Sequence, residues 1–221
     1  MASIIKTNLC SKLFALTLAG CGILDIKIPN FKMRSTFSDT AWEAMYAPYD
    51  QSTYQMVLDV LRPDDVVLDL GAGDLRLSRQ MARIVQKVYA VEINASVLDQ
   101  APASSDPWAG RVIPICADAR TFDFPSDVTV GVLMMRHCLH FGLYFAKLQK
   151  SGARRLITNA RWHMSVEMVD LRRERVPLRK IGMGWYACRC GGTGFKEGPA
   201  EQWTMEMDRV IHDVEDCPQC R

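Results

Sequence analysis

Residues 66–74, with the sequence VVLDLGAGD, indicate the class of fold more clearly than any other part of the chain. The first five residues are apolar and rich in valine around one aspartate, which is typical of a strand buried on both faces of a sheet. Gly71 and Gly73 follow and predict a tight turn where backbone can approach a ligand closely. The apolar spacing from Leu75 to Val85 then predicts a helix. A strand, a glycine turn and a helix in this order begin an α/β unit.

The same alternation continues along the chain. Further strands are predicted at 88–92, 111–116, 128–135 and 155–158, with helices over 38–61 (interrupted at Pro48), 95–101 and 143–150. Strands that alternate with helices at this spacing predict a Rossmann-like, mostly parallel sheet with helices on both faces.

The composition is that of an ordinary globular protein. Of 221 residues, 48% are hydrophobic and 24% are charged, so a sizeable core is available without a disulfide framework. The net charge of +2 does not by itself indicate a nucleic-acid-binding protein, although it leaves room for a local basic patch.

Two acidic residues follow later strands of the expected sheet. Glu92 ends the second strand, where a carboxylate can accept hydrogen bonds from ribose hydroxyls. Asp118 and Ala119 follow the third strand, where a carboxylate can accept from an adenine amino group. Arg76 stands where a dinucleotide fingerprint has its last glycine, which disfavours a pyrophosphate site. The pattern therefore favours a ligand that carries adenosine but is not a dinucleotide.

These residues resemble the glycine motif, the ribose acid and the adenine acid of class I S-adenosylmethionine-dependent methyltransferases, over about residues 40–160. The resemblance implies a methyltransferase with S-adenosylmethionine as cofactor. It implies a donor site made of Asp69, Gly71, Gly73, Glu92, Asp118 and Ala119. Two features depart from the family pattern. Leu75 replaces the usual third glycine, and the Asp/Asn-Pro-Pro-Tyr/Phe motif of many base-amino methyltransferases is absent.

The catalytic candidates follow the fourth expected strand, in the sequence RHCLHF at 136–141. Methyl transfer requires an aligned nucleophile and, for some acceptors, removal of a proton. His137 titrates near neutral pH and is the candidate base, with Arg136 beside it as the second catalytic candidate. The alternative is that His137 and His140 only hydrogen-bond the loop. Residues 159–162, after the fifth strand, are weaker candidates for lining the pocket.

Four cysteines near the C-terminus are paired as Cys-x-Cys and Cys-x-x-Cys. Cys188, Cys190, Cys217 and Cys220 predict a closed tetrahedral zinc site with a structural role. Unliganded thiols or two disulfides are the alternatives, and paired spacing in a reducing compartment favours metal. The pairs are separated by 26 residues, with room for a hairpin at 203–210, so the segment resembles a zinc ribbon.

A basic link, RRERVPLRK at 172–180, leads into this segment. The composition shift predicts a boundary near Val176, between a methyltransferase domain at 33–175 and a zinc-ribbon-like module at 176–221. The arginines are suited to phosphate contacts, although a solvated charged face is the commoner explanation. We expect RNA or a nucleic-acid-associated protein, rather than a small molecule, as methyl acceptor. The alternative is a non-catalytic zinc-containing binding module on a degenerate methyltransferase fold.

The first 32 residues resemble a bacterial lipoprotein signal. An apolar run at 13–20 is too short to span a bilayer and is followed by Cys21. Export would separate the enzyme from its cytosolic methyl donor and expose its thiols to oxidation. We therefore expect residues 1–32 to lie outside the fold, Met33 to be the better first residue, and the protein to be cytoplasmic without a stable membrane partner.

Overall fold

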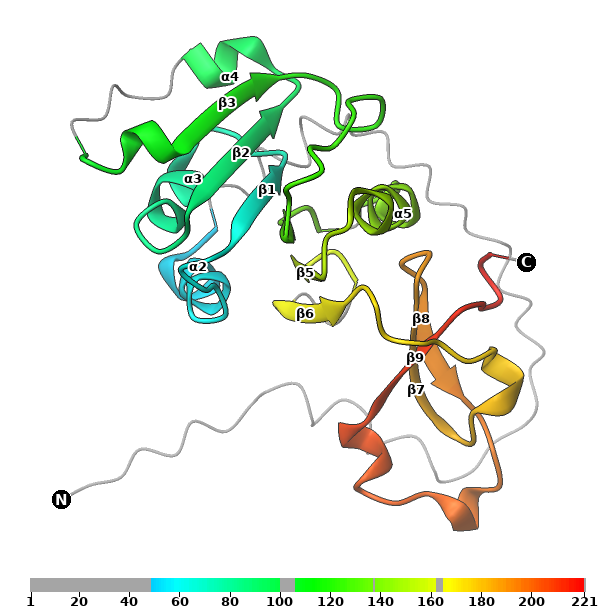
Figure 1. The fold of residues 1–221 in the computed structure, drawn as a ribbon. Helices are drawn as coiled ribbons and strands as arrows, with labels where there is room; N and C mark the ends of the chain where they lie inside the picture. Colours follow the sequence, from blue (N-terminus) through cyan, green and yellow to red (C-terminus); the bar gives the residue numbers. More distant parts are fainter. Residues whose placement is uncertain (1–48, 100–105, 137, 162–164, 221) are drawn as a thin grey trace, which may run out of the picture. The chain divides into compact units, whose positions relative to one another are not determined.

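The computed structural model describes residues 49–99, 106–136, 138–161 and 165–220 (Figure 1). Every element below belongs to the compact unit that ends at Arg221. The leader-like segment and the part of the first expected helix before residue 49 lie outside the described residues. Among the helices that are described, none is both long and apolar enough to cross a membrane.

A six-stranded sheet forms the larger part of the fold, with strand order β3-β2-β1-β4-β5-β6 (Figure 1). The strands are β1 (Val66–Leu70), β2 (Lys87–Glu92), β3 (Val112–Cys116), β4 (Val130–Leu133), β5 (Arg155–Thr158) and β6 (Glu167–Asp170). Four neighbouring pairs are parallel, and β6 runs antiparallel to β5. The predicted mostly parallel sheet is confirmed. The edge strand β6 was not predicted, because its four residues alternate weakly between exposed and buried positions.

Helices cover both faces of this sheet. The helices are α2 (Gln51–Leu58), α3 (Arg76–Met81), α4 (Ala95–Asp99) and α5 (Phe141–Ser151). Val57 of α2 and Met81 of α3 share one buried cluster with Val67 of β1. Phe145 of α5 packs in a second cluster with Leu68, the next residue of β1. Because neighbouring side chains of a strand point to opposite faces, β1 is buried from both sides, as its valine-rich sequence predicts.

Local sequence explains where the helices begin and how closely they pack. Asp50 accepts a hydrogen bond from the Thr53 amide at 2.7 Å and caps the first turn of α2. Gly152 ends α5 with a positive φ of 92°. A Cβ added to Gly131 would lie 2.5 Å from a methyl carbon of Leu148, so glycine in β4 lets α5 approach the sheet.

The C-terminal part forms a separate three-stranded sheet of order β8-β7-β9. It contains β7 (Gly184–Cys188), β8 (Thr193–Lys196) and β9 (Ile211–Val214), with the 3-10 turns η3 (Leu178–Lys180), η4 (Ala200–Gln202) and η5 (Met207–Arg209). The hairpin predicted at 203–210 is wrong, since that segment contains η5. The antiparallel hairpin is β7–β8, because Gly191, with a φ of 98°, reverses the chain immediately after the first cysteine pair.

The expected boundary near Val176 stays a prediction. Val176 forms an isolated parallel bridge with Val214, the last residue of β9. The strand β9 runs parallel to β7, so the C-terminal sheet combines one antiparallel and one parallel pair.

Candidate active site and metal centre

The glycine turn after β1 is tied to the neighbouring strand. The amides of Gly71 and Ala72 both donate to the carbonyl of Val91, at 2.9 and 3.0 Å. Gly71 and Gly73 have positive φ angles of 75° and 54°, a conformation that strains any residue with a Cβ. The backbone conformation of the turn therefore favours glycine at these two positions.

Leu75 has the conformation that a glycine would adopt easily at this position. Its φ is 65°, in the left-handed region that costs a non-glycine residue roughly 1–2 kcal/mol. The side chain is buried beside Ala72 and Ala90, and this burial offsets the strain. Leu75 therefore keeps the backbone turn that a glycine would form here, and its side chain adds an apolar contact beneath the turn.

Glu92 joins the end of β2 to the glycine turn. One carboxylate oxygen accepts from the Gly73 amide at 3.0 Å, and the other accepts from the Asn94 amide at 2.9 Å. The residue is only 4% exposed. A carboxylate offers about four acceptor positions, so two remain for a ligand's hydroxyl groups.

Asp69 lies under the same turn and is 3% exposed. The Ser78 hydroxyl donates to it at 2.5 Å, which links β1 to α3. Burial raises the pKa of Asp69 to about 6, the Ser78 hydrogen bond opposes this shift, and the charge of Glu92 adds to it. Through Ser78, Asp69 therefore connects the strand before the glycine turn to the helix after it.

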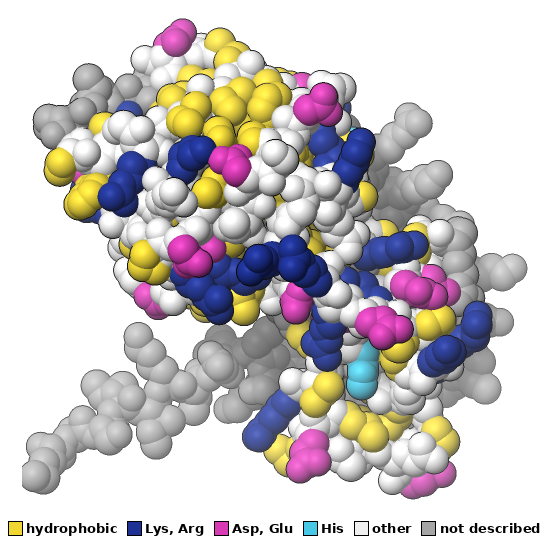
Figure 2. All heavy atoms as spheres, viewed as in Figure 1, with side chains coloured by type: hydrophobic (Ala, Val, Ile, Leu, Met, Phe, Trp, Pro, Cys, Tyr) yellow, Lys and Arg dark blue, Asp and Glu magenta, His cyan; other side chains and the backbone are white. Residues whose placement is uncertain are grey.

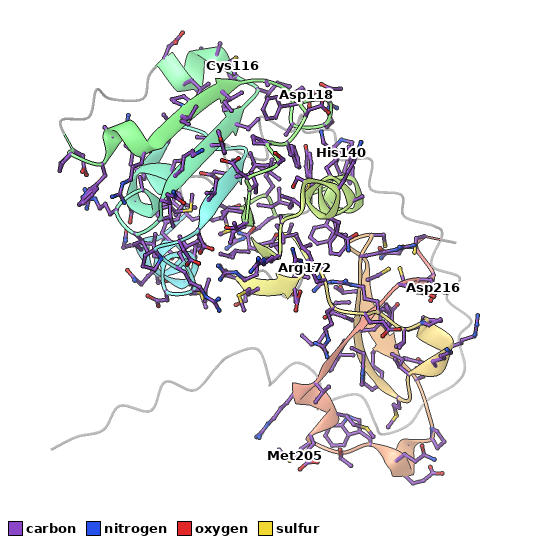
Figure 3. The ribbon with its side chains drawn as sticks, viewed as in Figure 1. Cys116, Asp118, His140, Arg172, Met205 and Asp216 are labelled. Carbon is purple, nitrogen blue, oxygen red and sulfur yellow. The ribbon has the colours of Figure 1, made fainter. Side chains whose placement is uncertain are left out.

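Asp118 lies in the loop after β3, at the same edge of the sheet as the end of β2. Glu92 pairs in register with Cys116, two residues before Asp118. Figure 3 labels Asp118 in this loop and His140 at the start of α5. The Arg120 side chain forms a 2.7 Å ion pair with Asp118 and holds its pKa down at about 2. A ligand's amino group would share this carboxylate with Arg120.

Lys147 of α5 fixes the loop that carries Asp118. Its ammonium donates to the carbonyls of Ala119 at 2.7 Å, Arg120 at 3.1 Å and Phe122 at 2.6 Å. Ala119 itself is buried, with 8% exposure. Lys147 was not predicted from the sequence, because no local pattern relates a lysine on a helix to carbonyl groups about 25 residues earlier.

The loop after β4 reaches the glycine turn. A Cβ added to Gly71 would lie 3.1 Å from the terminal methyl of Met135. The guanidinium of Arg136 lies 5.1 Å from the ring centre of Tyr49, whose hydroxyl donates to the Met134 carbonyl at 2.9 Å. His137, the candidate base, lies outside the described residues. The contacts of Met135 and Tyr49 could not be inferred from the sequence, because both are long-range.

Asn159 directly follows β5 and is 2% exposed. Its amide nitrogen and oxygen have no hydrogen-bond partner within the described part of the chain. Burying an unpaired amide is costly, so such a group calls for a specific explanation. Asn159 is one of the weaker pocket candidates predicted from the sequence, and its unpaired amide is available for that role.

Arg161, another of those weaker candidates, forms an ion-pair network instead. Its side chain is 3% exposed and binds both carboxylate oxygens of Glu167 at 2.8 Å. It also lies 3.4 Å from Asp213 of β9 and 3.5 Å from the carbonyl of Cys188. Arg161 therefore connects the β5–β6 loop to the C-terminal sheet, and Trp162 beside it is outside the described residues.

The four C-terminal cysteines come together as the sequence predicts. The sulfurs of Cys188, Cys190, Cys217 and Cys220 all lie within 4.8 Å of one another. Two glycines shape the turn around them: Gly191 adopts a positive φ, and a Cβ on Gly192 would lie 2.8 Å from the Cys217 sulfur. The amide of Gly192 points at the Cys190 sulfur at 3.4 Å, and that of Cys217 points at the Cys220 sulfur at 3.2 Å.

The sulfur separations fit a tetrahedral metal ion. Three of them are 3.8, 3.5 and 3.7 Å, for the pairs 188–220, 190–217 and 217–220. Zinc–sulfur bonds of about 2.3 Å in a tetrahedron place the sulfurs about 3.8 Å apart. Disulfide bonds would require about 2.05 Å. Burial raises the pKa of the Cys188 and Cys217 thiols, so a cation is needed to stabilise their thiolates.

The strand order and the helices on both faces define a Rossmann-like fold, with β1 between β2 and β4 at the point where the strand order reverses. Residues 67–157 match a family model described as a methyltransferase domain. The matched segment includes most of β1, the glycine turn, Glu92, Asp118 and the loop after β4. No curated protein matches the chain.

Several solved structures are similar to the chain. They include a precorrin-8w decarboxylase from Methanobacterium thermoautotrophicum, with 18% identity over 50% of this chain and 63% of that one, and a TM-score of 0.41. The 23S rRNA methyltransferase ErmE has 19% identity over 50% and 46% of the two chains, with a TM-score of 0.42. The precorrin-6y C5,15-methyltransferase from Geobacter metallireducens has 18% identity over 49% and 62%, with a TM-score of 0.42. The chain thus spans less than two thirds of each.

Proposed function

We propose that this protein is a methyltransferase that uses S-adenosylmethionine, bound by the glycine turn, Glu92 and the loop of Asp118 and Ala119. The observation that carries the proposal is the 3.0 Å hydrogen bond from the Gly73 amide to Glu92. This hydrogen bond connects the glycine turn, where a ligand can approach the backbone closely, to a buried acid that has acceptor positions left. Both lie at the edge of the sheet where ligands of open α/β folds bind.

When bound, the donor supplies a methyl group on a sulfonium, and the acceptor must approach in line with the carbon–sulfur bond. Met135 lies against the glycine turn, so the loop after β4 is the segment that would face an acceptor. His137 in that loop is our candidate to take a proton from the acceptor, and Arg136, stacked on Tyr49, is our candidate to position it.

Isothermal titration calorimetry of the full chain with S-adenosylmethionine tests the donor assignment. We expect one binding site per chain and no comparable heat with a dinucleotide such as NAD, because Arg76 replaces the last glycine of that fingerprint. Absence of binding would remove the enzyme proposal. Binding without methyl transfer to any fraction of cell extract would favour the non-catalytic alternative.

For the acceptor, we propose RNA or a nucleic-acid-associated protein. Arg172, Arg173, Arg179 and Lys180 of the basic link are exposed, as is Arg154 after α5. Figure 2 shows Lys and Arg side chains gathered near the position where Figure 3 labels Arg172. Arg175 is less available, since it donates to the carbonyls of Arg173 and Asp170 at 2.9 Å.

Transfer of a labelled methyl group to cell extract, followed by ribonuclease or protease digestion, separates these acceptors. If the link binds single-stranded RNA, the double variant Arg172→Ala/Arg179→Ala should reduce the salt slope of RNA binding by about 0.7 for each phosphate that the protein no longer neutralises. Arg76→Ala, an exposed arginine of α3 in an ion pair with Asp74, is the matched control. Label that resists both digestions would favour a small molecule.

We also propose that the cysteine cluster holds one structural zinc ion, because four sulfurs complete its coordination. A cytoplasmic location is proposed with it, since reduced thiols persist there.

A further inference from the structure

The C-terminal sheet carries an open hollow of about 460 Å³ that belongs to neither the donor site nor the cysteine cluster. Its walls combine apolar, aromatic and acidic side chains with a glycine. The lining residues are Met183, Phe195, Glu197, Gly198, Ala200 and Trp203.

The two aromatic residues of the hollow differ in their surroundings: Phe195 packs against another ring, and Trp203 is exposed. The Phe195 ring packs edge-on against Trp185, with ring centres 5.0 Å apart, and the Trp185 ring nitrogen donates to Asp208 at 2.7 Å. Trp203 is 51% exposed, and Met205 close to it in the sequence is 69% exposed. Trp203 and Met205 therefore expose a large apolar surface to water. Exposed apolar side chains that are grouped in this way often mark a binding surface.

The segment around the hollow is acidic. Residues 197–208 contain Glu197, Glu201, Glu206 and Asp208 and no lysine or arginine, while Arg209 follows directly. The neighbouring Lys196 points away, since its ammonium donates to the carbonyls of Leu178, Arg179 and Ile181, at 3.1, 3.2 and 2.5 Å. With Lys196 and Arg209 counted against the four acids, residues 196–209 still carry a net charge of −2. The hollow thus presents an acid and aromatic rings under a negative local charge, which repels phosphate and attracts cations.

We propose that this hollow binds a lysine or arginine side chain of a basic protein segment. The alkyl stem of such a side chain would pack on Met183 and Trp203, and its cationic head would lie over an aromatic face and pair with Glu197. The proposal does not depend on donor binding. It assigns the C-terminal module a role in recruiting a partner with positive charge, on a surface distinct from the basic link.

A pair of short synthetic peptides tests the proposal on the full chain. One peptide is rich in lysine and arginine, and the other carries glutamine at those positions. Binding is followed by calorimetry and by tryptophan fluorescence. We expect the basic peptide alone to bind, with an affinity that falls as salt rises from about 50 mM to about 500 mM. Trp203→Ala should weaken binding about tenfold, and Glu197→Gln about two- to fivefold.

Matched controls distinguish a general effect of the protein's charge from binding at the hollow. Glu174→Gln removes another exposed acid outside the hollow, and Trp108→Ala removes another partly exposed tryptophan, so both should leave peptide binding unchanged. Equal binding by wild type, Glu197→Gln and Trp203→Ala would overturn the proposal, as would no binding of the basic peptide. Loss of single-stranded RNA binding in Trp203→Ala, with peptide binding retained, would assign the hollow to RNA instead. Titration with S-adenosylmethionine in the same variants should be unchanged, which separates this test from that of the enzyme.

Discussion

The Gly73 amide donates a 3.0 Å hydrogen bond to the Glu92 carboxylate, so the turn after β1 and the acid at the end of β2 form one unit. The second Glu92 oxygen accepts from Asn94 at 2.9 Å. A single buried side chain therefore serves two purposes: it shapes the glycine turn and offers its remaining acceptor positions to a ligand.

Two substitutions of Glu92 should separate its effect on donor binding from its effect on stability. Glu92→Gln keeps one acceptor oxygen and should weaken S-adenosylmethionine binding by about 1.5–3 kcal/mol, with a modest loss of stability. Glu92→Ala leaves two amides without their partner and should also lower the free energy of unfolding by about 1–3 kcal/mol for each. Calorimetry and denaturant unfolding measure the two quantities, with Glu174→Gln as control. Unchanged donor affinity in Glu92→Gln would contradict the assignment of this acid.

Asp69 should make stability fall as pH rises from about 4 to about 7. Its folded pKa is raised to about 6, above the ordinary value of 3.8, so the folded state binds the proton more tightly than the unfolded state. Its contribution is fully present below the unfolded pKa and is lost as pH rises through about 6, which amounts to about 2–3 kcal/mol. Asp69→Asn should remove this dependence in urea unfolding at several pH values.

The pKa of Asp127 is shifted in the opposite direction from that of Asp69. Lys87 hydrogen-bonds Asp127 and lowers its pKa, so its stabilising effect is present above the ordinary pKa and is lost as pH falls. Asp127→Asn should therefore leave the loss of stability toward neutral pH intact. If Asp69→Asn and wild type show the same pH dependence, Asp69 does not carry the proposed proton.

The cysteine cluster should contain about one zinc ion per chain by elemental analysis. Cys190→Ser should release the ion and speed hydrogen exchange in β7, β8 and β9, while β1, β2 and β4 stay protected, because the two sheets are separately hydrogen-bonded. Cys116→Ser, an exposed cysteine outside the cluster, should retain full metal content. Purified chain with four reactive thiols, no metal and well-protected C-terminal strands would disprove the site.

Arg161 should be far more important for stability than an exposed arginine. Arg161→Met leaves Glu167 with an uncompensated partly buried charge and leaves Asp213 only its longer ion pair with Arg173 at 3.6 Å, and we expect a loss of about 3–5 kcal/mol in the free energy of unfolding. Arg76→Met removes an exposed ion pair with Asp74 and should cost about 0–1 kcal/mol. A double-mutant cycle with Glu167→Gln measures the coupling, and a coupling near zero would rule the network out as a stabilising contact.

Lys147 should act on donor binding by positioning the loop of Asp118. Lys147→Met removes the cation that binds three carbonyls of residues 119–122, so amide exchange in that loop should rise about tenfold and donor affinity should fall. Lys150→Met, on the same helix at an exposed position, should change neither quantity. Methyl transfer at saturating donor should recover in Lys147→Met, whereas loss of a catalytic group would not be rescued in this way.

The amino-acid sequence alone determined the α/β class, the extent of β1 and β5, the glycine turn and the grouping of the four cysteines. These features depend on short-range patterns: alternating strands and helices, glycines next to a strand end, and paired cysteine spacing. Spacing along the chain places the members of each such pattern close together, except that the two cysteine pairs, 26 residues apart, are joined by the pairing of β7 with β9.

Tertiary structure alone decided which distant residues share a function. The partnership of Glu92 with Gly73, of Lys147 with the loop at 119–122, and of Arg161 with Asp213 joins residues 19 to 52 positions apart. The β7–β8 hairpin likewise formed where Gly191 could adopt a left-handed turn, rather than in the longer segment before β9. Such contacts depend on strand order and packing of the whole domain, which local pattern does not encode.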